Sequence, residues 1–285
     1  MKFVIFIIRG VPSGHEEWSD NMNTIVCVKQ VLDPEIPPAK FKIDPAAKQV
    51  IPPPGVPPVI SVYDERAVEA ACRLKDKHKG KITVISMGSA KAADVIKHAI
   101  SMGADDGFVL QDPAFENLDS FGTAYVLAKA IQKIGGYDLV LCGRQAADWG
   151  AGQVGSILAE ILGLPVVTLA CAIEAVDKKL KVKRMVNDGY EVLEAPMPSV
   201  VTVSSEIGLP RLPGGMGLML ARKKQIPVWK AQDIGAESSQ LDKTNAHTEV
   251  TSLSVPTRKT ECEIIAGGTP GEAAVNLALK LIKLI

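Results

Sequence analysis

Short apolar runs alternate with helical patterns through the first two thirds of this 285-residue chain, and this alternation restricts the fold most strongly. Four runs have the length and composition of strands, namely 25–31, Ile82–Met87, 107–110 and 139–142. Helical patterns with one apolar face separate them, beginning after Ser61 and covering 90–102 and 121–134. Because a parallel neighbour needs a crossover connection, strands separated by single helices predict an α/β fold with a doubly wound, mostly parallel sheet.

The composition excludes several classes of function. Basic and acidic residues number 32 each and aromatic residues make up 5%, so we expect no nucleic-acid binding. No run approaches the roughly 20 apolar residues of a membrane helix, so we expect no membrane insertion. The five cysteines lie apart without CxxC spacing: Cys27, Cys72, Cys142, Cys171 and Cys262. They predict reduced thiols, a cytoplasmic or matrix-like location and no metal site.

Hairpins and one loop interrupt the strand–helix pattern of the main domain, which we place at 22–224. Ser61 and Asp64 have the spacing of a capping box, with Asp in place of the usual Glu or Gln. A Gly/Pro-rich loop at 209–217 leads into a helical pattern at 218–224. The remaining predicted strands are the hairpins 42–44 with 49–51 and 180–186 with 191–194, and the strand 198–203.

The two ends of the chain depart from this pattern. The start resembles a signal peptide, but its apolar core is six residues long where about 7–15 are expected. We therefore interpret residues 1–21 as an N-terminal extension without function. The segment 225–285 lacks a strand–helix pattern until an amphipathic helix at 271–285. It is interpreted either as an arm and helix that pack on another chain, or as a tail on its own domain.

Residues 142–155 form a glycine-rich bend between a predicted strand and a predicted helix. Such a bend presents free backbone N–H groups and the positive end of a helix, which together suit a phosphate. Many bends of this kind bind nothing, but this one carries polar side chains that a turn does not need: Arg144, Gln145, Asp148 and Gln153. In a doubly wound sheet, Lys29, Gly88 and Arg144 are expected around one cleft. For Lys29, an exposed lysine at a strand end is an equally good interpretation.

Several motifs, in order along the chain, resemble the β subunit of electron-transfer flavoproteins. They are Cys27-Val-Lys-Gln-Val31, Tyr63-Asp-Glu-Arg-Ala-Val-Glu-Ala-Ala-Cys-Arg-Leu-Lys75, Met102-Gly-Ala-Asp105, Gly143-Arg-Gln-Ala146, Pro198-Ser-Val-Val-Thr202, and Pro210-Arg211 followed by Ala221-Arg-Lys-Lys224. The resemblance runs from about Met22 to Ile234. It implies a Rossmann-like domain that binds an adenine nucleotide, and a C-terminal arm that embraces an α subunit.

The resemblance also implies a function. The α subunit of such proteins carries most contacts to a redox-active FAD, and the heterodimer passes electrons from acyl-CoA dehydrogenases or similar flavoenzymes to a downstream acceptor. The β cleft holds AMP in simple members and a second FAD in electron-bifurcating members, which also oxidise NADH. A bifurcating subunit and a stand-alone nucleotide-binding module are the alternatives. No Ser/His/Asp or Cys/His arrangement supports nucleophilic chemistry, so we expect no catalytic residue.

Carried over position by position, the resemblance implies which residues contact the nucleotide in the β cleft. They are Cys27, Val28, Ser61, Met87, Gly143, Gln145, Ala146, Asp148, Gly152, Gln153, Val154 and Gly155, to which the convergence of strand ends adds Lys29, Gly88 and Arg144. Tyr63 falls where the family has an aromatic residue near the flavin of the α subunit. We therefore expect the nucleotide to lie over the ends of the central strands.

The resemblance places a partner-recognition loop at 208–222, with Gly215 where relatives have an anchoring leucine. Met216 and Leu218 are therefore predicted to contact the partner enzyme. For Met216 the alternative is an exposed loop residue with no energetic role. The sequence also departs from the family pattern at Met185, at Asn187 and at 149–152, where acidic residues are usual.

Overall fold

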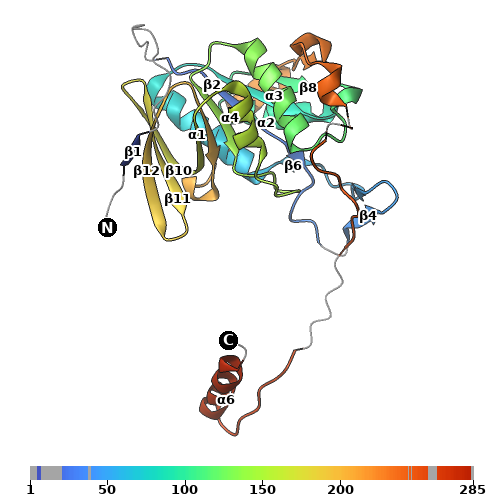
Figure 1. The fold of residues 1–285 in the computed structure, drawn as a ribbon, viewed down its shortest axis with the longest axis vertical. Coiled ribbons are helices and arrows are strands. Elements are labelled where there is room, and N and C mark those ends of the chain that lie inside the picture. Colours follow the sequence, from blue (N-terminus) through green and yellow to red (C-terminus); the bar gives the residue numbers. More distant parts are fainter. Residues whose placement is uncertain are drawn as a thin grey trace. The chain divides into compact units, whose positions relative to one another are not determined.

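The computed structural model describes residues 5–7, 21–37, 40–242, 244, 246–255 and 262–283. The chain divides into two compact units. One consists of Met1–Phe41 with Pro52–Thr251, and the other of Lys42–Ile51 with Ser252–Ile285. The larger unit is an α/β domain (Figure 1).

A large twisted sheet forms the framework of the larger unit. In order across the sheet, its strands are β1 (Ile5–Ile7), β12 (Gly189–Pro196), β11 (Lys179–Val186), β10 (Val166–Val176), β13 (Ser199–Val203), β9 (Leu139–Gly143), β2 (Thr24–Cys27), β7 (Ile82–Met87), β8 (Asp106–Leu110) and β14 (Val228–Trp229). The pairs β10–β11 and β11–β12 are antiparallel, and the other neighbours are parallel. This confirms the predicted α/β class, the mostly parallel sheet and the β-hairpin extension, drawn in yellow in Figure 1.

Helices cover both faces of the sheet, because neighbouring residues of each central strand point to opposite sides. Val26 and Leu141 belong to the core that includes Ala71, whereas Ile25 and Val140 belong to the other core. The helices are α1 (Val62–His78), α2 (Ala93–Met102), α3 (Ser120–Ile134), α4 (Val154–Leu162) and α5 (Gly215–Lys223), and the 3₁₀ turns are η2 (Ala90–Ala92), η3 (Pro113–Phe115), η4 (Ser205–Ile207), η5 (Gln232–Ile234) and η6 (Ser238–Leu241). Helices α1 and α2 pack on the first core, and α3 and α4 pack on the second.

The strand order reverses at β2. The chain builds outward from β2 to β7 and β8, then returns through α3 to β9 on the opposite side of β2. Parallel α/β sheets bind their ligands at such a reversal, outside the carboxyl ends of the strands. Cys27 and Cys142, which are neighbours in the ladder between β2 and β9, mark this point.

The predicted strand 25–31 is shorter than expected. Strand β2 ends at Cys27, and β3 (Gln30–Val31) leaves the main sheet to pair with β6 (Val59–Ile60). The apolar run continues through both strands, so composition alone did not reveal the break between them. Between the two strands, the backbone N–H of Val28 donates to the carbonyl of Ile85 and that of Lys29 donates to the Asp64 carboxylate.

Residues 225–251, which the sequence analysis assigns to the C-terminal arm, pack on the larger unit. Strand β14 pairs with β8, and the Trp229 ring stacks on Phe108 with ring centroids 3.9 Å apart. Ile234 and Leu241 are buried in the core under α3. The compact α/β unit therefore extends to Thr251 rather than ending at residue 224, because isolated apolar residues anchor an otherwise polar segment.

The smaller unit contains the predicted hairpin of β4 (Lys42–Asp44) with β5 (Gln49–Ile51), and the helix α6 (Pro270–Ile282). The Thr269 hydroxyl accepts a hydrogen bond from the backbone N–H of Glu272 at 3.2 Å, and the Glu272 carboxylate accepts one from Gly268 at 2.8 Å. These reciprocal contacts cap the helix. Its apolar side chains, including Val275 and Leu279, are exposed in this chain.

None of the helices in the described part of the chain has the length and apolar character needed to cross a membrane. The same part of the chain holds no group of three or more His, Cys, Asp or Glu residues that could bind a metal ion.

Candidate functional site: a cleft at the strand ends

A buried acid joins the ends of the two central strands. Asp64, in the first turn of α1, accepts hydrogen bonds from the backbone N–H of Lys29 at 2.8 Å and of Gly143 at 3.0 Å. Burial raises the pKa of Asp64 to about 7, although these hydrogen bonds, one from Ser61 and the charge of Lys29 all oppose the rise. The site therefore has a buried carboxyl group that titrates near neutral pH and is hydrogen-bonded to the backbone N–H groups of Lys29 and Gly143.

Gly143 is required by this contact. A Cβ atom at this position would lie 2.4 Å from Oδ1 of Asp64 and 2.8 Å from Cβ of Tyr63. Any side chain would push α1 away from β9. The glycine that the sequence analysis assigned to a phosphate-binding bend therefore has a packing role as well.

The capping box predicted for Ser61 and Asp64 is wrong. Ser61 is the N-cap of α1, but its side chain makes no capping hydrogen bond. Its hydroxyl instead accepts a hydrogen bond from the backbone N–H of Ala147 at 3.3 Å, and its own N–H donates to the carbonyl of Lys29 at 2.9 Å. Donors from neighbouring strands and loops compete successfully with the local helix N–H groups. The sequence analysis therefore missed Asp64 as a site residue, because its spacing from Ser61 gave a purely local interpretation.

The loop that follows β9 folds back over the end of β2. The Lys29 ammonium lies 2.7 Å from the Asp148 carboxylate, and both side chains are partly exposed. The backbone N–H of Gly150 donates to the carbonyl of Ala146 at 3.0 Å. Gly150 and Gly152 have φ angles of +64° and +66°, which a residue with a Cβ atom rarely adopts. The structure therefore brings Lys29, Ser61 and the loop together. The predicted convergence of Lys29, Gly88 and Arg144 around one cleft stays a prediction.

The loop ends at the N-terminus of α4, where backbone N–H groups are available. Gln153 is the N-cap and makes no side-chain capping hydrogen bond. A Cβ atom at Gly155 would lie 2.5 Å from Cγ2 of Thr202, so this glycine lets α4 approach β13 closely. An open pocket of about 390 Å³ lies here, with Gly152, Gln153 and Ser156 on one side and Asp119, Phe121 and His247 on the other. A free helix N-terminus beside a pocket of this size fits a phosphate-bearing ligand.

Two cysteines form the end of the sheet at this cleft. Cys27 and Cys142 are both buried and are ladder neighbours. The hydrogen bond with the Cys142 thiol, together with burial, raises the pKa of Cys27 well above its usual range. Cys27 is therefore a neutral thiol and contributes to packing. Beside it, the backbone N–H of Val28 donates to the carbonyl of Ile85 at 2.9 Å.

Arg144 points toward α1 and β13. Its guanidinium lies 5.5 Å from the centre of the Tyr63 ring and donates a hydrogen bond to Ser204 at 3.4 Å. Its backbone N–H donates to the carbonyl of Val203 at 2.8 Å. Arg144 and Tyr63 thus form a cation–aromatic pair at the rim of the site.

Other predicted contact residues lie at the end of β7 or on α5. Met87 ends β7, the strand next to β2, and the backbone N–H of Gly88 donates to the carbonyl of Leu110 at 3.0 Å. Gly215, Met216 and Leu218 instead belong to α5, which begins at Gly215 and packs on α2. A Cβ atom at Gly217 would lie 2.3 Å from the carbonyl oxygen of Ser101, so this glycine permits the close helix contact. The structure does not bring the α5 residues into the cleft.

Comparisons with known proteins agree on one family. A sequence model described as the electron transfer flavoprotein domain matches residues 55–234. The chain belongs to the electron transfer flavoprotein family. The electron transfer flavoprotein subunit beta of Thermoanaerobacterium thermosaccharolyticum is 39% identical over 261 residues, which are 91% of this chain and 98% of that protein.

Two other relatives cover most of the chain. The caffeyl-CoA reductase-Etf complex subunit CarD of Acetobacterium woodii is 38% identical over 91% of this chain and 98% of that protein. The electron transfer flavoprotein subunit beta of Megasphaera elsdenii is 37% identical over 84% of this chain and 89% of that protein. The resemblance stated from the motifs is confirmed. Family membership supports a role in electron transfer and an association with flavin, and β subunits of electron transfer flavoproteins pair with an α subunit.

Proposed function

We propose that this chain is the β subunit of a heterodimeric electron-transfer flavoprotein. In this proposal the heterodimer passes electrons from an acyl-CoA dehydrogenase-type flavoenzyme to a downstream acceptor, and the β cleft holds AMP or a second FAD. The observation that carries the proposal is the N-terminus of α4, which has no side-chain cap, lies beside an open pocket and follows β9, a neighbour of β2 where the strand order reverses. It offers N–H donors to a phosphate where parallel α/β sheets bind nucleotides.

Each part of the cleft has a role in this proposal. The backbone N–H groups at the start of α4, from 154 to 156, would hold the phosphate. The strand ends at Cys27, Val28 and Met87 would border the adenine, as the family resemblance implies. The ion pair of Lys29 with Asp148 supports the loop that covers them. AMP in this cleft would have a structural role, whereas a second FAD would supply redox chemistry.

The rim of the site carries two groups that would suit a flavin: Tyr63 for the flavin bound mainly by the α subunit, and Arg144 for a second FAD in the β cleft. Tyr63 presents an aromatic ring, and the Arg144 guanidinium beside it carries a positive charge. A positive charge near a flavin stabilises its anionic reduced forms. This pair would therefore influence the flavin potential through electrostatics, without forming or breaking a bond.

The alternative is an electron-bifurcating member in which the β cleft holds FAD and NADH is oxidised. Arg144 and the stretch 153–155 resemble what bifurcating relatives carry, and the matched Acetobacterium woodii protein is a subunit of a caffeyl-CoA reductase-Etf complex. Residues 149–152 lack the acidic pattern usual there, which argues against this alternative.

The nucleotide content of the purified α/β complex separates these possibilities. Denaturation releases the bound nucleotides, which are then identified and counted per heterodimer. One FAD with one AMP supports the simple carrier and excludes bifurcation at the β cleft. Two FAD without AMP support the bifurcating subunit, and NADH oxidation is then the next assay. A complex without any nucleotide in the β cleft would contradict the role given to the loop and α4.

A further inference from the structure

The arginine at the rim of the site is held from two sides. The Arg144 guanidinium lies 5.5 Å from the centre of the Tyr63 ring, and its Nη1 donates a hydrogen bond to the Ser204 hydroxyl at 3.4 Å. The backbone N–H of Arg144 donates to the carbonyl of Val203 at 2.8 Å, which fixes the point from which the side chain extends. A cation–aromatic contact at a partly exposed site and a hydrogen bond of this length are both weak. The position of the guanidinium therefore depends on what strengthens its bond to Ser204.

Ser204 connects Arg144 to an acid. Ser204 is fully buried, and its backbone N–H donates to the carbonyl of Ala170 at 2.9 Å. Its hydroxyl donates its one proton to Oε2 of Glu206, which leaves the lone pairs of the oxygen for the N–H of Arg144. The sulfur of Met185, which lies 4.0 Å from the same oxygen, carries no charge. The carboxylate polarises the hydroxyl and makes it a better acceptor for the cation.

Glu206 is thus a charged partner of Arg144 on the other side of this hydroxyl. The hydrogen bond from Ser204 and the charge of Arg144 lower the pKa of Glu206, although burial opposes them, so the carboxylate is ionised at neutral pH. Glu206 itself is exposed, and water screens the field of an exposed charge. An effect of Glu206 on a ligand in the cleft would therefore act through the position of Arg144.

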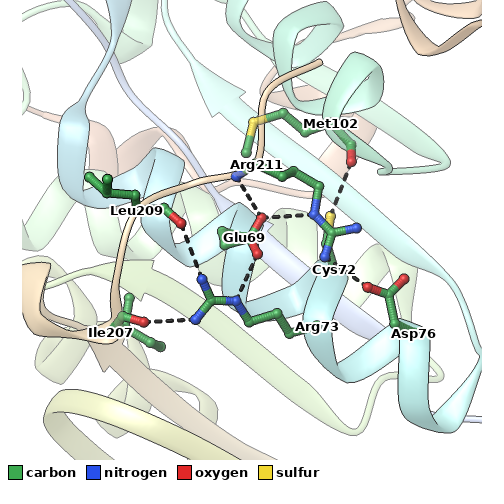
Figure 2. A network of polar contacts seen from close by, with 8 residues as sticks. All are labelled: Glu69, Cys72, Arg73, Asp76, Met102, Ile207, Leu209 and Arg211. Atoms are coloured by element: carbon green, nitrogen blue, oxygen red, sulfur yellow. Dashed lines mark hydrogen bonds and ion pairs between the residues drawn. The ribbon is translucent and has the colours of Figure 1, made fainter. Parts of the chain in front are cut away.

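The turn η4, which carries Glu206, is tied to α1 (Figure 2). Nη1 of Arg73 donates to the carbonyl oxygen of Ile207, the residue after Glu206, at 2.7 Å. Nε of Arg73 donates to Oε1 of Glu69 at 2.7 Å, and Oε2 of Glu69 accepts a hydrogen bond from the backbone N–H of Arg211 at 3.0 Å. The Glu69 side chain is only 6% exposed. A buried carboxylate on α1 therefore keeps η4 in place through Arg73.

These contacts form a closed ring, because Tyr63 and Arg73 belong to the same helix. From Tyr63 the ring passes to Arg144 and then through Ser204 into η4. It returns from η4 to α1 through Arg73. One helix thus sets the position of both the Tyr63 ring and η4, and Arg144 contacts both.

We infer that Glu206 is a positioning residue, which acts through the Ser204 hydroxyl and holds the Arg144 guanidinium at the rim of the β cleft. The inference rests on the proposed function, in which this cation lies near the phosphate of AMP or the ring of a second FAD. Glu206 lies outside the motifs that carry the family resemblance, and its link to Arg144 spans about 60 positions of the chain.

Positioning and charge predict effects of opposite sign. Removing an acid makes the surroundings of an anionic ligand more positive, which by itself strengthens phosphate binding and raises the potential of a flavin. Releasing Arg144 from its position has the reverse effect on both quantities. The sign of the change in a Glu206 variant therefore distinguishes the two roles.

The test uses the purified α/β complex, with Arg144→Ala as the reference variant. For a complex that holds AMP, equilibrium dialysis measures the dissociation constant of AMP, and for a complex that holds a second FAD, a redox titration measures the midpoint potential of that flavin. Arg144→Ala is expected to weaken AMP binding by at least about tenfold, as for a lost hydrogen bond to a charged group. A tenfold change in the ratio of reduced to oxidised flavin lowers the potential of a two-electron couple by about 30 mV.

Ser204→Ala is the decisive variant, because it keeps both charges and removes the hydroxyl between them. We expect it to change the same quantity in the same direction by about three- to tenfold, and Glu206→Ala to do likewise. Glu206→Gln keeps an acceptor for the hydroxyl and should recover part of the loss. Glu174→Ala is the matched control, because Glu174 is an exposed acid on β10, and less than about a twofold change is expected. Added to Arg144→Ala, Glu206→Ala should cause no further loss.

Three results would overturn the inference alone. Tighter AMP binding or a higher potential in Glu206→Ala would show a direct effect of its charge. A wild-type value in Ser204→Ala would show that the hydroxyl does not hold Arg144, and an equal loss in Glu174→Ala would show that any exposed acid has this effect. If Arg144→Ala changes neither quantity, or the β cleft holds no nucleotide, the proposed role of the site fails first and the inference fails with it.

Discussion

The buried carboxyl of Asp64 predicts an unusual dependence of stability on pH. Its pKa rises from the 3.8 of a free aspartate to about 7 in the folded chain. An acid of this kind binds its proton more tightly when the protein is folded. At a pH between these two pKa values, unfolding therefore releases a proton. The free energy of unfolding therefore falls as pH rises through this window, and the stabilisation is complete only below the unfolded pKa.

The size of the effect follows from the shift. A shift of about three pKa units corresponds to about 4 kcal/mol at 1.36 kcal/mol per unit. Asp64→Asn removes the titrating group and keeps the shape of the side chain. The difference in unfolding free energy, wild type minus Asp64→Asn, should therefore decrease by up to about 4 kcal/mol between pH 4 and pH 8.

Urea unfolding of the α/β complex at one protein concentration, repeated across this pH range, measures that difference. Asp188→Asn is the control for the change from Asp to Asn itself, because Asp188 is exposed in the hairpin turn. A difference for Asp64→Asn that rises with pH would refute the reasoning. It would mean that the hydrogen bonds from Lys29 and Gly143 outweigh burial and keep the carboxylate ionised.

Two further predictions concern the cleft. Gly155→Ala should destabilise the complex by about 1–3 kcal/mol, because its Cβ would lie 2.5 Å from Cγ2 of Thr202. Thermal or urea unfolding measures this loss. Adding Thr202→Ser, which removes that methyl group, should restore part of the lost stability. Arg144→Ala should weaken nucleotide retention or shift the potential of a flavin in the β cleft. If the nucleotide content and the redox potential of the variant both stay at wild-type values, Arg144 has neither role.

Much of the architecture could be predicted because strands and helices leave a local pattern. The runs at Ile82–Met87 and 139–142 became β7 and β9, and the hairpin after residue 179 formed as expected. The segment 225–251 could not be placed, since it is held by single residues such as Trp229 and Leu241 rather than by a periodic face. Its polar composition gave no indication of which surface it covers.

The cleft shows the same division between local and long-range information. Glycines and polar residues after a strand predicted the loop at 143–155, and the structure brings this loop to Lys29 and Ser61. Asp64 was interpreted as part of a helix cap, because it follows Ser61 by three positions, which is the spacing of a capping box. Its real partners lie 35 and 79 positions away in sequence.

By itself the sequence determined the class of fold, the alternation of its central strands and helices, and the family, because apolar periodicity and ordered motifs are properties of neighbouring residues. Only the tertiary structure decided which strand ends meet, and so that Asp64 receives the amides of Lys29 and Gly143. It also decided that Glu69 holds Arg211, at a separation of 142 residues. Such pairs form because folding places one buried acid beside donors from distant strands and loops, and no local spacing encodes which donors those are.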